Sequence, residues 1–491
     1  MKRINKILIA IFLIPCLFFI NACKCNKDND KVDNSESEFE ISSNDDSLGT
    51  VSYSTDGEKT ILKVFPREEK DAYFVGWQVK ETGEILNYNY VNDSKYEFEK
   101  DSYLNGKSLV ALFSSIDYEK VETNNEFQFI TYTNINVSVV NSYLGTNKKV
   151  SVPEYFNDNK VIDFSKNFFS IVIKELVLPN SFIRITNYSS AIENLESITI
   201  PSSIREIETS AFADLPLKTV IFENDSKLEK IGDYSFKNTK LTSIVIPSNV
   251  EKIGAFAFAD TKLENILIPR NVEKIGSGAF RNTELESVTF EEESTLEEIS
   301  ASVFYNTKLT NIIFPESIKK IGGSSFERTL LNSITIPKNV EIIEYSAFAS
   351  TPLNSVTFSK DSLLKEIGNL AFSSTAITSI TIPASVETIG NYAFKDSTLS
   401  SITISENSKL SVVGIGVFSN TLLTSITLPN SLKVINSNLF SGTMITNIVI
   451  PSSVETIYDG AFLDLATLTS ISFSANSKLK IIGENALKEL A

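Results

Sequence analysis

Apolar residues recur with a long fixed period over most of the chain. One phenylalanine anchors each repeat, and successive anchors are 22 or 24 residues apart. The anchors are Phe212, Phe236, Phe258, Phe280, Phe304, Phe326, Phe348, Phe372, Phe394, Phe418, Phe440 and Phe462. Leu487 stands about where the next anchor would fall, and strand-like segments that begin at Leu176 and Leu195 add two degenerate units in front. A period in this range is typical of a solenoid with one repeat per turn.

A single unit predicts a strand followed by a returning edge. The segment Leu263-x-x-Ile266-x-Ile268-Pro269 has period two, so its isoleucines share one face of a strand. Proline then ends the strand, because it cannot donate to a ladder. The later apolar positions, up to Ala279-Phe280, return over the interior as an irregular or partly helical edge. Each unit buries these side chains only against its neighbours.

The 24-residue spacing has a visible cause. Five units lack the proline and carry an acidic or Ser-rich insert, and these inserts begin at Phe222, Phe290, Phe358, Ile404 and Phe473. Residues 291–293 are three consecutive glutamates. They are consistent with a solvated loop or with weak cation binding.

Residues 48–118 have a different pattern, in which apolar and polar positions alternate over short runs. Turn residues such as Asp56-Gly57 and Thr82-Gly83 separate these runs, so we expect a small antiparallel β-domain. Trp77, the only tryptophan, is expected to anchor its core, with a ligand platform as the alternative. The Tyr-Phe-Val-Gly-Trp segment at 73–77 resembles the β-grasp repeats of Gram-positive surface proteins.

The N-terminus predicts export and lipidation. Basic residues precede an apolar run, Ile7 to Ile20, that is too short to span a membrane as a helix, as in a secretory signal peptide. The run ends in Ile20-Asn21-Ala22-Cys23, which resembles a bacterial lipobox. The resemblance implies that 1–22 is a lipoprotein signal peptide and that Cys23 carries lipid, which anchors the protein to the cell membrane. The alternative is an ordinary signal peptide with a chance cysteine.

Residues 23–47 are acidic and poor in apolar side chains, so they are expected to form a flexible tether. A calcium loop is the alternative, but the glycine and the regular oxygen spacing of such loops are missing. Only Cys16, Cys23 and Cys25 exist, so a lipidated mature chain has no internal disulfide and no thiol metal site.

Composition narrows the function. The chain has 491 residues, a net charge of −16 and no histidine. Catalytic triads, imidazole zinc sites and haem ligation of the proximal-histidine type are therefore excluded. The acidic balance disfavours nucleic acid as a partner. No catalytic residues, metal ligands or cofactor motifs are apparent.

The repeats resemble the leucine-rich repeats of the BspA-like family of bacterial surface proteins. The pattern Leu-x-x-Ile-x-Ile-Pro-x-x-Val-x-x-Ile-Gly-x-x-Ala-Phe carries the resemblance over residues 127–491. It implies a mainly β fold, a right-handed leucine-rich-repeat solenoid of about 14 units, preceded here by the small β-domain. One departure is consistent: threonine replaces the family's cysteine after Ala-Phe-x-x, as at Thr283, and its hydroxyl can still bond a turn carbonyl. Because glycine after the isoleucine is replaced in five units, for example by Tyr458, a left-handed backbone there is not expected to be obligatory.

Outward-facing strand positions form the candidate binding face. They carry hydroxyl, amide or β-branched side chains and no charge, and we expect them to line one long sheet. The selected residues are Ser243, Asn265, Thr289, Asn311, Thr335, Ser355, Thr381, Ser401, Thr427 and Asn447. Ser and Thr also simply favour exposed strand positions, so β-propensity alone is the competing interpretation.

The leading hypothesis is a membrane-anchored, adhesin-like surface lipoprotein whose solenoid binds an extracellular protein of a host or neighbouring cell. The family resemblance implies adhesion. A structural or display protein without a dedicated ligand is the alternative. A carboxylate-dependent hydrolase is a remote third hypothesis, which would require a pocket with two close carboxylates.

Overall fold

The computed structural model describes residues 40–56, 59–67, 72–87, 96–99, 107–165, 167–188 and 190–487. The predicted signal peptide, Cys23 and most of the tether lie outside the described residues. Within this described part, no helix is both long and apolar enough to cross a membrane.

The first described part is a small β-domain with two sheets, ordered β1-β7-β4-β5 and β2-β3-β6. Its elements are β1 (Ile41–Ser43), β2 (Gly49–Asp56), β3 (Lys59–Pro66), β4 (Ala72–Val79), β5 (Ile85–Asn87), β6 (Tyr96–Glu99), β7 (Leu109–Ser115) and the 3-10 helix η3 (Ile116–Tyr118). All its strand pairs are antiparallel except β1 with β7. Trp77 is fully buried and packs its ring edge-on against Phe74, as expected for a core anchor.

One boundary differs from the prediction. Residues 41–43, which the sequence assigns to the tether, form β1, and its Ile41 pairs with Leu109. The side-chain amide of Asn44 also bonds the backbone of Phe113. Because Ile41 and Leu48 are rare apolar residues in a polar stretch, composition averaged over 23–47 conceals this short strand.

A five-stranded sheet follows, ordered β12-β13-β10-β9-β8. Its strands are β8 (Glu119–Thr123), β9 (Phe127–Tyr132), β10 (Val137–Tyr143), β12 (Tyr155–Phe156) and β13 (Asn159–Phe164). Because β8 pairs with β9, this structure begins at residue 119 instead of the predicted 127.

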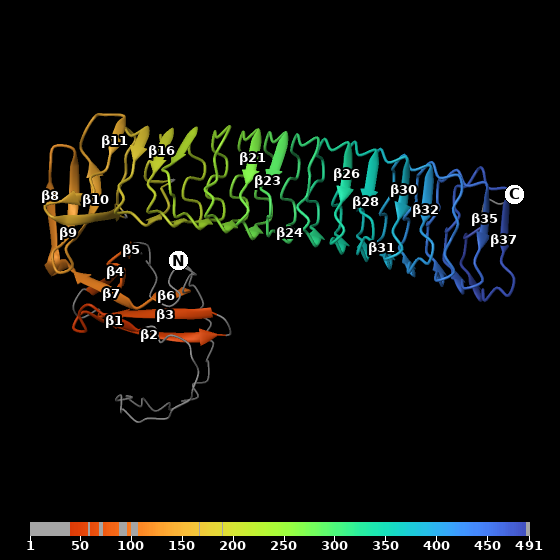
Figure 1. Ribbon diagram of the computed structural model, residues 1–491, viewed down its shortest axis with the longest axis horizontal. Helices are drawn as coiled ribbons and strands as arrows, with labels where there is room; N and C mark the ends of the chain where they lie inside the picture. Colours follow the sequence, from red (N-terminus) through yellow and green to blue (C-terminus); the bar gives the residue numbers. More distant parts are fainter. Residues whose placement is uncertain are drawn as a thin grey trace, which may run out of the picture. The chain divides into compact units, whose positions relative to one another are not determined.

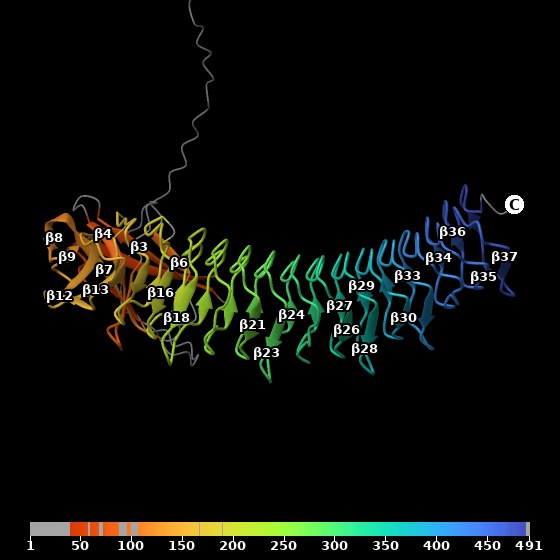
Figure 2. The ribbon, with the colours of Figure 1, turned by 90° about the horizontal axis from the view of Figure 1, so that it is seen from above.

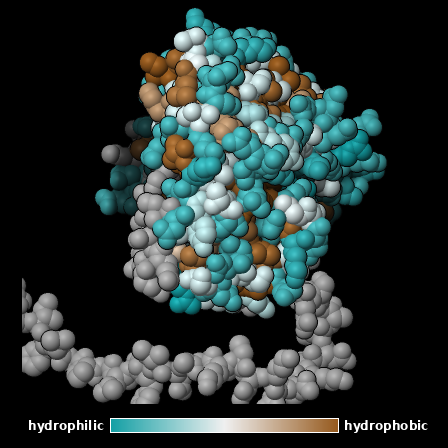
Figure 3. Space-filling view, turned by 90° about the vertical axis from the view of Figure 1, so that its left-hand side faces the viewer, coloured by the Kyte–Doolittle hydropathy of each residue, from teal (hydrophilic) through white to brown (hydrophobic). Residues whose placement is uncertain are grey.

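Both faces of this five-stranded sheet are buried. Phe129, Val140 and Val161 on one face join the solenoid core. Val139 and Ile162 on the other face join a cluster with the β-domain. Figure 3 views the molecule from its left-hand side in Figure 1, and there hydrophobic residues form small separate areas among hydrophilic ones. The sheet thus caps the first turn of the solenoid, an end that repeat proteins must cover.

The solenoid has about 16 turns, slightly more than the predicted 14, and Figure 1 shows them stacked in chain order. One row holds mostly four-residue strands: β11 (Lys149–Ser151), β14 (Glu175–Val177), β16 (Ser197–Ile200), β18 (Thr219–Phe222), β21 (Asn265–Ile268), β23 (Ser287–Phe290), β26 (Ser333–Ile336), β28 (Ser355–Phe358), β30 (Ser379–Ile382), β32 (Ser401–Ile404), β35 (Asn447–Ile450) and β37 (Ser470–Phe473). We call it the long-strand row.

The short-strand row lies on another side of each turn (Figures 1 and 2). It consists of β15 (Arg184–Ile185), β17 (Glu206–Ile207), β19 (Lys230–Ile231), β20 (Lys252–Ile253), β22 (Lys274–Ile275), β24 (Glu298–Ile299), β25 (Lys320–Ile321), β27 (Ile342–Ile343), β29 (Glu366–Ile367), β31 (Thr388–Ile389), β33 (Val412–Val413), β34 (Val434–Ile435), β36 (Thr456–Ile457) and β38 (Ile481–Ile482). All pairings between successive strands of either row are parallel.

The returning edge is not helical in the described repeats, which corrects the partly helical expectation. Each turn places two residues in the left-handed region, two before and two after the anchor phenylalanine, as at Gly278 (φ 64°) and Asn282 (φ 56°) around Phe280. A right-handed helix cannot continue through residues in the left-handed region, and each turn has two of them only four positions apart. The backbone bonds to the next turn instead: the amides of Gly278 and Phe280 donate to the carbonyls of Ala301 and Val303.

The anchor phenylalanines form a continuous stack through the core. From Phe212 to Phe462, neighbouring ring centroids are 5.2 to 6.1 Å apart and the rings are nearly parallel. After most anchors a buried threonine bonds the phenylalanine carbonyl three residues earlier, at 2.9 Å for Thr283 and Phe280. Serine makes this bond after Phe394, and leucine occupies the position after Phe212 and Phe462. This bond confirms the role predicted for the hydroxyl.

Where glycine follows the core isoleucine, it allows close backbone contact. Gly276 does not have a positive φ, which agrees with the expectation that a left-handed backbone is not required there. A Cβ on Gly276 would instead overlap the backbone nitrogen of Ala255 in the preceding turn.

Candidate functional site: the stepped long-strand face

All ten predicted site residues are solvent-exposed. Seven lie on strands of the long-strand row, while Ser243, Asn311 and Thr427 lie in turns that form no strand at this position. Few of them are tied to neighbours, although the Ser287 hydroxyl donates to Asn265 Oδ1 at 2.5 Å. Their exposure agrees with the sequence, and their role as a binding face stays a prediction.

The predicted single long sheet is wrong. Hydrogen-bonded ladders in the long-strand row are short, and each one ends at a turn that carries an insert. The last strands of the ladders are β18, β23, β28, β32 and β37. Inserts therefore divide the face into a series of steps.

The residue that directly follows each strand determines where the ladders of the long-strand row end. In insert-bearing turns this residue has an N–H, which bonds the strand end of the preceding turn, as from Glu291 to the Ile268 carbonyl and from Ser359 to Ile336. In most other turns the residue is proline, which cannot donate. Proline-bearing turns therefore pair with the turn before them less readily, although β14 and β16 remain paired.

The inserts are ordered turns with a shared construction. Each contains a left-handed residue, and these are Asp225, Glu293, Asp361, Asn407 and Asn476. The serine that follows accepts a hydrogen bond from an amide two residues later, as Ser294 does from Leu296. The Glu291 carboxylate accepts the amide of Arg270, and Arg270 also pairs with Glu293. This pairing supplies the positive charge near the three glutamates, and no cluster of metal-ligating residues occurs among the described residues.

The exposed side chains divide the face into two chemical regions. Ile221, Val245, Leu267 and Ile313 give its first part large exposed apolar groups, with Val245 and Ile313 each 80% exposed. From Ser333 to Thr427 the exposed pairs of each turn are serine and threonine. The sequence shows both regions, but treating the column as one β-branched or hydroxyl surface missed the division.

Two hollows lie beside inserts. One of about 720 Å³ is formed by the 222–226 insert, Val220, Ile221, Val245 and Pro247. The other, of about 740 Å³, lies over β28, β30 and β32 between two inserts and is lined mainly by hydroxyl groups. The inserts therefore act as low walls on the exposed face.

The short-strand row carries a ladder of charges. Ion pairs link its successive turns, such as Glu206 with Arg184 and Lys230 at 2.9 and 2.7 Å. Other ion pairs flank the starts of the long strands: Glu196, which precedes β16, lies 2.5 and 2.6 Å from Lys174 and Lys218, and hydrogen bonds from these two lysines lower its pKa to about 2. These pairs hold neighbouring turns in register, while the exposed strand positions from β16 onward carry no charge.

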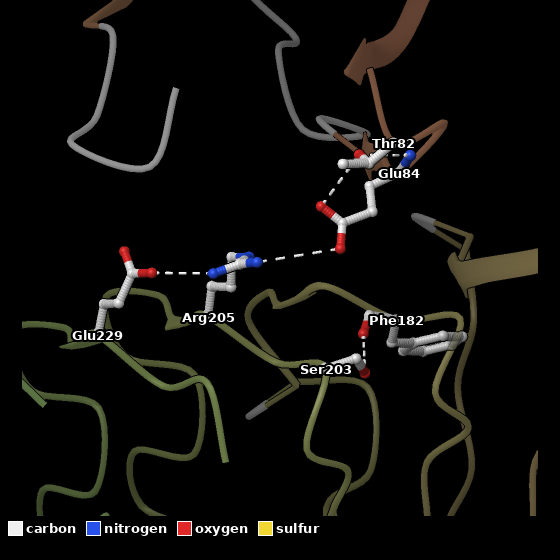
Figure 4. Close-up of polar contacts among 6 residues, drawn as sticks. All are labelled: Thr82, Glu84, Phe182, Ser203, Arg205 and Glu229. Carbon is white, nitrogen blue, oxygen red and sulfur yellow. Dashed lines mark hydrogen bonds and ion pairs between the residues drawn. The ribbon is translucent and has the colours of Figure 1, made fainter. Parts of the chain in front are cut away.

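Arg205 connects the solenoid to the β-domain (Figure 4). Its guanidinium pairs with Glu229 of the next turn at 2.9 Å and with Glu84, which precedes β5, at 3.9 Å. Sequence patterns gave no sign of this pair, because its partners are more than 100 residues apart.

A family comparison matches the repeats. The BspA type leucine rich repeat region matches in six copies over residues 160–286, 252–365 and 365–490, which is more than half of the chain. The chain belongs to this family. Family members are cell-surface proteins.

Among solved structures, the chain is similar to a leucine-rich repeat protein from Bacteroides ovatus, with 24% identity, a TM-score of 0.50, and 76% of this chain and 92% of that chain covered. It is also similar to a leucine rich cell surface protein from Faecalibacterium prausnitzii (21% identity, TM-score 0.41, 74% and 94% covered) and to the pneumococcal vaccine antigen PcpA (20%, 0.37, 76% and 95%). A comparison with curated proteins gave no match. The structure from Bacteroides ovatus supports the leucine-rich repeat fold.

Proposed function

We propose that the protein is a lipid-anchored cell-surface protein that binds an extracellular protein with its long-strand face. The observation that supports this most is the face itself: uncharged side chains recur at its exposed strand positions on turn after turn, while ion pairs lie on the short-strand row and at the starts of the long strands. A neutral, stepped surface on a stiff solenoid offers a partner many small contacts without the desolvation of charges. The lipobox-like segment ending in Cys23 supports the anchor.

Binding is tested with the full chain displayed on bacterial cells. Labelled extracellular-matrix and serum proteins are added, and saturable binding is expected to at least one of them at micromolar concentration. Cells that lack the chain are the control. Saturable binding to none of them would favour a structural or display protein instead.

Anchoring is tested separately with Cys23→Ser. The unsubstituted chain is expected to incorporate a radiolabelled fatty acid and to fractionate with membranes, while the variant does neither. A chain that remains membrane-bound and labelled after this substitution would contradict lipidation at Cys23.

A further inference from the structure

The first part of the long-strand face combines an apolar floor with acidic walls. The floor consists of Ile221, Val245 and Leu267, which are 50%, 80% and 48% exposed on three successive turns. The inserts 222–226 and 290–294 stand at either side. We call this region the apolar bay, and its strands β18, β21 and β23 are labelled in Figure 2.

Apolar side chains are exposed here on three successive turns, although the core beneath them is filled. The inward neighbours on these strands, such as Ile266 and Ile268, are almost completely buried. Two of the floor side chains, Ile221 and Val245, line the hollow of about 720 Å³ beside the first insert, together with Phe222 and Pro247. Contiguous exposed apolar surface beside a hollow is typical of an interaction site.

The walls determine what charge a partner should carry. Glu223 and Asp225 project from the first insert, and residues 291–293 add three carboxylates from the second. Lys227 and Arg270 are the cations within or next to these inserts, so two positive and five negative groups leave a local charge of −3. A ligand with an apolar centre and basic ends therefore complements the bay, whereas an anionic lipid surface does not.

The spacing of the walls sets the length of that ligand. Phe222 and Phe290, which end β18 and β23, are three turns apart, or about 14 Å at the usual strand spacing of about 4.8 Å. An extended peptide covers the same distance in about four residues, and residues i, i+2 and i+4 then face the same side. We propose that the apolar bay binds an extended protein segment of the form basic-x-apolar-x-basic. This inference rests on the proposed function, because it specifies the partner for one part of the same face.

The test uses the full chain in mild detergent and a fluorescent peptide that contains Lys-Ser-Leu-Ser-Lys. Two further peptides replace both lysines with glutamate or the leucine with serine. Fluorescence anisotropy is expected to show saturable binding of the first peptide, at least about tenfold weaker binding of the other two, and weaker binding as salt increases.

Matched variants assign the binding to the bay. Val245→Ser with Leu267→Ser removes two of the three floor side chains and should weaken peptide binding about tenfold, because these side chains lose apolar contact with the ligand. Glu223→Gln with Asp225→Asn should remove most of the salt dependence, and asparagine tolerates the left-handed backbone at 225. Val449→Ser is the control, since this valine occupies the same column outside the bay and is 56% exposed. Unchanged circular dichroism verifies the fold of each variant.

Several results would overturn the inference. These are equal binding of lysine- and glutamate-flanked peptides, no saturation up to millimolar peptide, or equal loss with Val449→Ser. A dimer of the chain, or binding to phosphatidylglycerol vesicles, that only the floor variant abolishes would assign the bay to another occupant. If cells still capture an extracellular protein and the floor variant captures it equally well, the bay proposal fails while the proposed function stands. If cells capture nothing, the peptide result alone decides the bay.

Discussion

The threonine that follows most anchor phenylalanines is a buried polar residue, and a local hydrogen bond offsets the cost of burying it. Thr283 is 4% exposed, and its hydroxyl donates to a carbonyl within its own turn. The same bond recurs in neighbouring turns, for example at Thr261 and Thr307. Turns with this threonine thus satisfy a backbone carbonyl without a thiol, which would be reactive in an exported protein.

We predict that Thr283→Val destabilises the protein by about 1 kcal/mol, because the methyl group fills the space but leaves the Phe280 carbonyl without this donor. Urea unfolding of both chains measures the difference. The same replacement at the exposed Thr289 serves as the control and should change stability by less than about 0.5 kcal/mol. Equal effects at the two positions would show that the buried bond contributes nothing.

Sequence reasoning found the threonine bond because the residue recurs at a fixed place beside a polar backbone group. It missed the left-handed residues, although the position two after each anchor repeatedly holds Asp, Asn or Ser, which accept that conformation. The position two before the anchor gives no such sign, since it includes Phe256 and Leu370. There the stacking of successive turns imposes the conformation against residue preference.

A pair of glutamates beside Arg184 should respond to pH in opposite directions. Arg184 lies 2.9 Å from Glu206 and 3.4 Å from Glu208. Burial favours the neutral form of Glu206, but the charges of Arg184 and Lys230 outweigh it and lower its pKa. Burial raises the pKa of Glu208, because the attraction of Arg184 is weaker than burial and Glu206 repels.

The sign of each contribution to stability follows. Ionised Glu206 stabilises the fold at pH values above its ordinary pKa of 4.5, and this stabilisation is lost as the pH falls through its lowered pKa. Glu208 favours the fold below pH 4.5, and the effect is lost as pH rises through its raised pKa. At pH 7, Glu206→Gln should therefore cost about 1.5 kcal/mol, whereas Glu208→Gln should be neutral or stabilising. Melting temperatures at pH 7 and pH 4 check this, and similar losses at pH 7 would contradict it.

At the scale of the element, one repeat combines three columns of contacts with the next: the phenylalanine stack, the short-strand pairs, and the amide bonds from the returning turn. The long-strand row contributes less regularly, because its ladders end at each insert. The prolines and inserts are plain in the sequence. Their effect on pairing was not predicted, because strand propensity describes side chains, whereas pairing here depends on one backbone N–H per turn.

The phenylalanine stack is therefore expected to dominate the stability of a turn. Phe280→Ala should cost about 3–5 kcal/mol, because a fully buried ring between Phe258 and Phe304 is replaced by a cavity. Phe473→Ala is the matched control, since this ring is 44% exposed and should cost less than about 2 kcal/mol. Thermal melts that shift equally for both variants would contradict the assignment of Phe280 to the core.

At the scale of the whole molecule, the five-stranded sheet β12-β13-β10-β9-β8 joins the β-domain to the solenoid. Its alternation places Val161 in the solenoid core and Ile162 in the cluster with Val75 and Leu112 of the β-domain. Asn134 adds a hydrogen bond to the Phe113 carbonyl at 2.9 Å, and Glu84 reaches Arg205. The β-domain is therefore fastened to the repeat through the cap, and the sequence could not show this because alternation alone does not identify what covers each face.

Adjacent residues of β13 should separate the two structures experimentally. Because Trp77 is the only tryptophan and is buried in the β-domain, its fluorescence reports unfolding of that domain, while circular dichroism follows mainly the solenoid. Ile162→Ser removes contacts with the β-domain, so the fluorescence transition should move to lower temperature by several degrees while circular dichroism changes little. Val161→Ser faces the solenoid core and should shift the circular dichroism transition instead. If both variants shift the two signals together, the cap, the β-domain and the solenoid unfold as one cooperative unit, and the fastening is stronger than these contacts imply.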